Sequence, residues 1–179
     1  MSSRQTRARV TECDLPAGSA LNNAFAGVDF HDSYRAPLAH ADLGPPRIFH
    51  GIFSHTPVWM RAVLILRNQF ARLAGLEVPR TSEIVGSRPR KRYQVGEKIG
   101  PWPIFSLTDS ELVAGRNNLH MDFRVSIMKV RDGGGPGVVV STICKVHNTF
   151  GRVYLSCVIP FHRFGVRKLM ARALHAQRL

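Results

Sequence analysis

The chain has few acidic residues, few cysteines and no long hydrophobic run. Its 3 cysteines are an odd number, and no two of them form a Cys-x-x-Cys motif. An odd count at this length argues against a disulfide framework, so we expect a reducing, cytoplasmic location. The basic start of the chain lacks the apolar core of a signal peptide. The most apolar stretch, residues 58–66, is interrupted by Arg61 and is too short for a transmembrane segment.

Positive charge is abundant, since 25 Lys and Arg face 12 Asp and Glu and give a formal net charge of +13. No acidic residue follows Asp132. A positive charge of this size attracts phosphates, anionic lipid or nucleic acid. The same excess of basic residues also arises when arginines simply cover the solvent-exposed surface. We find neither a recognisable nucleic-acid module nor aromatic residues interleaved with the charges, so we expect no specific nucleic-acid partner. We keep an anionic surface, such as a lipid bilayer, as an alternative partner.

The first half of the 179 residues predicts one strand followed by two helices. We expect a flexible basic arm over residues 1–13 and a single domain over residues 14–179. Residues 28–38 alternate weakly and end at a proline, as in an edge strand. A short helix is expected over residues 48–53. The second helix has Thr56 as its N-cap and Gly75 just past its end, and it is amphipathic.

The second half predicts sequential antiparallel strands and one long helix. The clearest strand covers residues 119–130, and a glycine-rich loop joins it to a second strand over residues 138–147. Pairing Val125 with Thr142 in this hairpin puts Asp122 opposite Lys145. The last helix should start at residue 148 or 149 and run to about residue 175, with Pro160 kinking or splitting it. This order predicts an α+β fold in which a curved antiparallel sheet wraps around the long helix.

Several phrases resemble the bacterial family called domain of unknown function 2867 (DUF2867). They lie at residues 53–70, 119–127, 145–154 and 151–170, the last reading GRVYLSCVIPFHRFGVRKLM. The likeness extends over about residues 10–172. It implies a helix-grip fold of the START-like, polyketide-cyclase-like (SRPBCC) superfamily, with a cavity for an apolar ligand between the sheet and the terminal helix. No catalytic set carries over, and without a glycine-rich dinucleotide fingerprint we expect no cofactor.

Four polar residues near the predicted hairpin are candidates for acid–base catalysis. Three of them share one face of the predicted strand, and the alternative is that this face is exposed to solvent. The four candidates are His120, Asp122, Arg124 and His147. The 8 histidines show neither His-x-His nor His-x-x-x-His spacing, so we expect no metal site.

Aromatic residues at several predicted elements are candidates for the lining of a ligand cavity, or else plain core. They are Tyr34, Trp59, Tyr93, Trp102, Phe105 and Tyr154. The first hypothesis is therefore a protein that binds an apolar or amphipathic small molecule between the sheet and the last helix. The alternatives are a cyclase or dehydratase-type enzyme that uses polar residues of the same cavity, and a basic protein that binds anionic lipid or nucleic acid.

Overall fold

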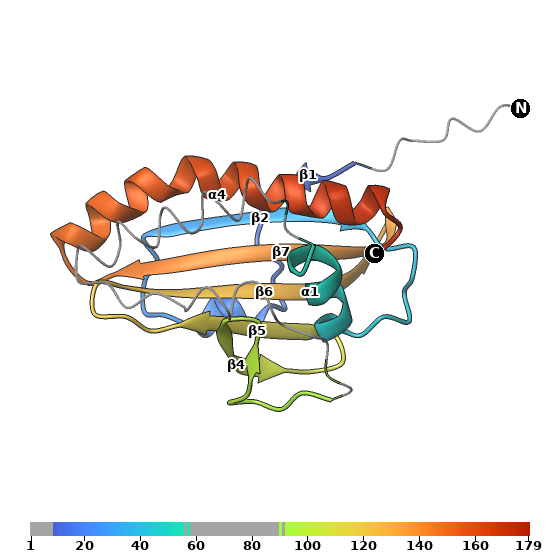
Figure 1. Cartoon of the computed structure of the whole chain (residues 1–179), viewed down its shortest axis with the longest axis horizontal. Helices are drawn as coiled ribbons and strands as arrows, with labels where there is room; N and C mark the ends of the chain where they lie inside the picture. Colours follow the sequence, from blue (N-terminus) through green and yellow to red (C-terminus); the bar gives the residue numbers. More distant parts are fainter. Residues whose placement is uncertain (1–8, 56, 58–89, 91) are drawn as a thin grey trace, which may run out of the picture.

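A computed structural model describes residues 9–55, 57, 90 and 92–179. The fold is α+β: a curved antiparallel sheet of 7 strands lies against a long C-terminal helix, as the sequence predicts (Figure 1). The strand order is β1-β2-β7-β6-β5-β4-β3. The described elements are β1 Thr11–Glu12, the 3-10 helix η1 Ala20–Asn23, β2 Phe30–Pro37, α1 Pro45–Phe53, β3 Lys98–Ile99, β4 Trp102–Leu107, β5 Glu111–Arg116, β6 Met121–Asp132, β7 Gly135–Val146 and α4 Thr149–His175.

The β6–β7 hairpin forms the centre of the sheet. Its predicted register is confirmed, because Val125 pairs with Thr142 and Asp122 with Lys145. The turn is tighter than the expected five-residue loop, since β6 ends at Asp132 and β7 already begins at Gly135. Gly135 has φ +85, a conformation that glycine adopts without a steric cost.

Helix α4 begins where the sequence predicts. The Asn148 side chain accepts a hydrogen bond from the Gly151 amide and so caps the first turn. Of the two expected effects of Pro160, a kink or a split, the split does not occur, because α4 is one continuous helix. Pro160 and Ser156 are both exposed, so the Ser156 carbonyl that loses its amide partner lies on the solvent side of the helix.

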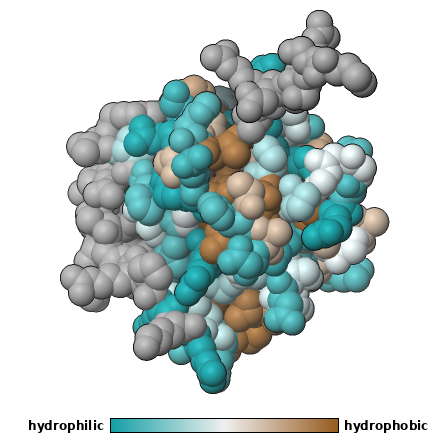
Figure 2. All heavy atoms as spheres, turned by 90° about the vertical axis from the view of Figure 1, so that its right-hand side faces the viewer, coloured by the Kyte–Doolittle hydropathy of each residue, from teal (hydrophilic) through white to brown (hydrophobic). Residues whose placement is uncertain are grey.

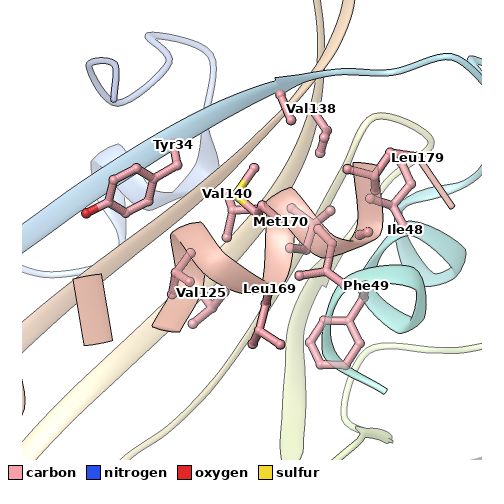
Figure 3. Close-up of a cluster of buried hydrophobic side chains, with 14 of the residues drawn as sticks. Tyr34, Ile48, Phe49, Val125, Val138, Val140, Leu169, Met170 and Leu179 are labelled. Atoms are coloured by element: carbon pink, nitrogen blue, oxygen red, sulfur yellow. The ribbon is translucent and has the colours of Figure 1, made fainter. Parts of the chain in front are cut away.

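The sheet buries residues on both faces. The helix face, covered by α1 and α4, holds the main core, which includes Tyr34, Val140 and Met170 (Figure 3). The outer face carries a smaller cluster in which Leu21 of η1 packs on Val113 and Ile143. Successive side chains along a strand point to opposite faces, so the apolar residues of both faces are buried when the chain folds.

The N-terminal half differs from the prediction at the arm and at the first helix. Thr11 and Glu12, expected in the flexible arm, pair with Arg35 and Tyr34, and β2 is therefore not the outermost strand there. The short predicted helix is α1, which begins three residues earlier than expected, at Pro45. The second predicted helix, residues 58–74, lies outside the described residues.

Candidate functional site

Four polar side chains meet on the helix face, beneath α4. The Tyr34 hydroxyl donates a hydrogen bond to Asp32 Oδ2 at 3.2 Å, and His162 Nε2 of α4 lies 3.3 Å from Asp32 Oδ1. Thr142 is the direct partner of Asp32 across the β2–β7 ladder. We call Asp32, Tyr34, Thr142 and His162 the Asp32 cluster.

Burial makes the polarity of this cluster costly. The Asp32 side chain is 1% exposed, and that of His162, its hydrogen-bond partner, is 23% exposed. Burial, followed by the neighbouring Asp32 carboxylate, raises the pKa of Tyr34 to about 12, so its hydroxyl keeps the proton that it donates to Asp32. Thr142 Oγ1 is buried and has no hydrogen-bond partner in the described part of the chain. A buried hydroxyl without a partner costs free energy, so a bound polar atom at this position would stabilise it.

The cluster lies at the edge of an apolar layer. In Figure 3 the ring of Tyr34 extends from β2, and its hydroxyl points away from the group formed by Ile48, Phe49 and Leu179. Two cations of α4 flank the cluster: Arg163 lies over the Phe30 ring and Arg167 over the Tyr34 ring, 5.6 and 5.8 Å from the ring centroids. The cluster thus places a few convergent polar groups beside apolar side chains, a combination that small-molecule sites share.

The predicted catalytic residues do not join this cluster. Arg124 points to the outer face, where its guanidinium stacks on Phe105 at 3.5 Å, and burial lowers its pKa. Asp122 shares that face by alternation, and its Oδ2 lies 3.1 Å from His147 Nε2. His120 hydrogen-bonds Asn148. The expectation that this strand face meets solvent is wrong for Arg124, because the chain before β2 covers it.

The predicted cross-strand ion pair also differs from the structure. Asp122 and Lys145 are directly opposite, as expected. However, Lys145 Nζ lies 3.8 Å from Asp29 Oδ2, and Asp122 pairs diagonally with His147. Register therefore fixes which residues are neighbours, but not which of their side chains pair.

The predicted cavity-lining residues divide between the two faces. Tyr34, Tyr93 and Trp102 belong to the helix-face core. Phe105 does not, because it is on the outer face beneath Arg124. Tyr154 is half-buried on α4, and Trp59 lies outside the described residues.

A second polar group on the helix face involves His50 of α1. Its Nδ1 lies 2.8 Å from Ser54 Oγ and its Nε2 lies 2.7 Å from the Tyr93 hydroxyl. Both ring nitrogens therefore have partners, and the ring is buried. This arrangement fixes the end of α1 against Tyr93.

Burial lowers the pKa of His50 from its ordinary value of 6.5, which predicts a pH dependence of stability. Above that value the ring is neutral in both the folded and the unfolded chain. As the pH falls below it, the unfolded chain takes up a proton first, so the free energy of unfolding decreases. We expect His50→Gln to reduce the stability difference between about pH 7.5 and about pH 5.5 in urea unfolding. The exposed His175→Gln is the control, and an equal effect there would contradict the prediction.

Of the Asp32 cluster, the sequence predicts Tyr34 as a site residue, but it does not predict the contact between Asp32 and His162. A signal was present in the alternation of β2. Phe30, Asp32 and Tyr34 fall on one face, so an acid interrupts an apolar row. The contact with His162 joins residues 130 positions apart and depends on how α4 crosses the sheet.

Within residues 9–55, 57, 90 and 92–179, no three side chains of the metal-ligating types converge. The helices described there are not long and apolar enough to cross a membrane. The model of a protein family of unknown function (DUF2867) matches residues 24–169 of the chain. Comparisons with curated proteins and with solved structures found no match.

Proposed function

The chain belongs to the DUF2867 family, and from this premise we propose that it binds an apolar or amphipathic small molecule between the sheet and α4. The Asp32 cluster carries the proposal, because it is polar, buried and flanked by apolar side chains. The apolar part of the ligand would pack on the helix-face core. Its polar end, a hydroxyl or carbonyl, would meet Thr142 Oγ1.

The same arrangement supports placing the domain in the START-like, helix-grip superfamily. A curved antiparallel sheet holds one long C-terminal helix against its inner side (Figure 1). Cys13, Cys144 and Cys157 are all free thiols, which fits the proposed location in a reducing bacterial cytoplasm.

A thermal-shift screen of the whole protein tests the proposal. Pairs of hydrophobic compounds that differ only in a hydroxyl or keto group should raise the Tm when that group is present, because a ligand of the native state stabilises it. Thr142→Val should reduce this shift. The matched control is Ser141→Ala, whose side chain bonds Ser33 on the outer face and should leave the shift unchanged. The proposal fails if none of the polar members raises the Tm, or if both variants behave alike.

An enzyme of the cyclase or dehydratase type is the second candidate, favoured by the Asp32–His162 contact. Asp32 would hold the imidazole, and His162 would move a proton at the polar end of the ligand. A carbonyl compound found in the screen separates the two candidates. Exchange of its α-hydrogens with deuterated solvent, lost in His162→Gln, would indicate catalysis, whereas binding without exchange would favour the first proposal.

A further inference from the structure

The outward side of α4 carries apolar side chains that the sheet does not cover. Val153 is 61% exposed and Phe161 is 69% exposed. Cys157, also exposed, lies between them at helical spacing, so the three residues form one stripe along the helix. We call Val153, Cys157 and Phe161 the α4 stripe. Exposed apolar rows of this kind on a soluble domain mark surfaces that bind a partner.

The charges beside the stripe are of one sign. Helix α4 contains no acidic residue. Its cations are all exposed. Lys168 and Arg172 follow Phe161 at helical spacing on the stripe side, whereas Arg163 and Arg167 lie over the Phe30 and Tyr34 rings on the sheet side. The stems of such side chains can lie along an apolar surface while their charged ends reach an anionic layer. An apolar row bordered by cations is the composition of helices that lie in a membrane interface.

The position of α4 in the fold suits such an interface. The helix has 27 residues and forms one outer layer of the molecule, along the sheet (Figure 1). Figure 2 shows the end of the molecule where α4 finishes, and its surface mixes hydrophilic and apolar side chains. A long helix on the outside can meet a flat surface along its length.

We propose that the α4 stripe and its cations dock this protein onto the surface of an anionic phospholipid bilayer. Charge complementarity identifies the partner, because every charged side chain of α4 is positive. Nucleic acid would satisfy the cations, but it offers nothing to the aliphatic Val153. A bilayer interface accepts both the charges and the apolar row. The inference does not rest on the small-molecule proposal, since it uses the opposite side of α4.

Co-sedimentation with vesicles tests the docking surface. The whole protein should bind vesicles containing phosphatidylglycerol, should not bind pure phosphatidylcholine, and should dissociate at high salt. Lys168→Gln with Arg172→Gln should weaken binding about 25-fold, or roughly five-fold for each charge removed. Phe161→Ser should weaken it about ten-fold, because a large apolar side chain no longer enters the interface.

The control removes the same charge elsewhere. Arg47 and Arg131 are exposed cations on α1 and β6, and their change to Gln lowers the net charge equally. This double variant should change vesicle binding less than two-fold. A loss as large as that of the α4 double variant would overturn the proposal, and so would absence of binding at low salt. Binding to DNA or RNA without binding to vesicles would also overturn it.

Discussion

Glu111→Ala is expected to lower the free energy of unfolding by about 3 kcal/mol. Glu111 is buried on the outer face, where its Oε1 accepts hydrogen bonds from the hydroxyls of Ser19 at 2.6 Å and Ser126 at 2.5 Å. Its Oε2 accepts a third bond from the Ala20 amide at 2.9 Å. The truncation leaves two buried hydroxyls and the partly buried Ala20 amide without their acceptor, and each unsatisfied buried group costs free energy.

The effect of Glu111→Ala should concentrate in the segment before β2. Ser19 caps η1, so the loss of its partner should release η1 from the sheet. Urea unfolding measures the total effect, and faster hydrogen exchange at the amides of Ala20 and Leu21 measures the local one. Glu97→Ala is the control, because that carboxylate is 40% exposed and pairs with Arg90, a kind of contact worth at most about 1 kcal/mol. Equal losses in the two variants would contradict our account of Glu111.

The role of Glu111 shows why the outer face could not be predicted. The sequence marks Ser126 and Arg124 as one polar row of a strand, and a polar row is typical of a solvated face. Here the chain before β2 folds over that row, where Phe25 lies 4.9 Å from the Arg124 guanidinium carbon. The covering segment has no regular hydrophobic period, so no local pattern indicates that it packs there.

The hairpin and α4 were predictable because their signals are local. Alternating apolar residues on both sides of a glycine-rich turn fix the register of β6 and β7, and Asn148 supplies a cap immediately before α4. The Asp32 cluster depends on the crossing of α4 over β2 instead. Asp32 and Thr142 become neighbours through the β2–β7 ladder, and His162 reaches them only when α4 packs on that ladder. Such contacts follow from tertiary packing, which sequence periods alone do not specify.

The two sides of α4 have different roles in the two proposals. His162 and Met170 face the sheet, whereas Val153 and Phe161 face outward. An amphipathic ligand taken from a bilayer would therefore need to travel only from one side of α4 to the other. The packing of α4 on the sheet is consequently the structural condition for both proposals, and its first turn lies against His120, just before β6.

Gly151→Ala is expected to lower the free energy of unfolding by about 3 kcal/mol, against the usual helix preference for alanine. Gly151 is buried in the first turn of α4, and a β-carbon there would collide with the backbone carbonyl of His120. It would also lie 3.2 Å from Val146 Cγ1. The carbonyl oxygen of His120 already accepts a hydrogen bond from the His147 amide, so it is held in place and the helix must move instead.

Gly165→Ala on the same helix separates this collision from helix propensity. No atom lies within 4 Å of a β-carbon built at Gly165, so that variant should gain up to about 1 kcal/mol. The two substitutions are chemically identical and lie in one element, so opposite signs in urea unfolding can arise only from what surrounds each glycine. Stabilisation by Gly151→Ala would mean that α4 does not approach β6 this closely.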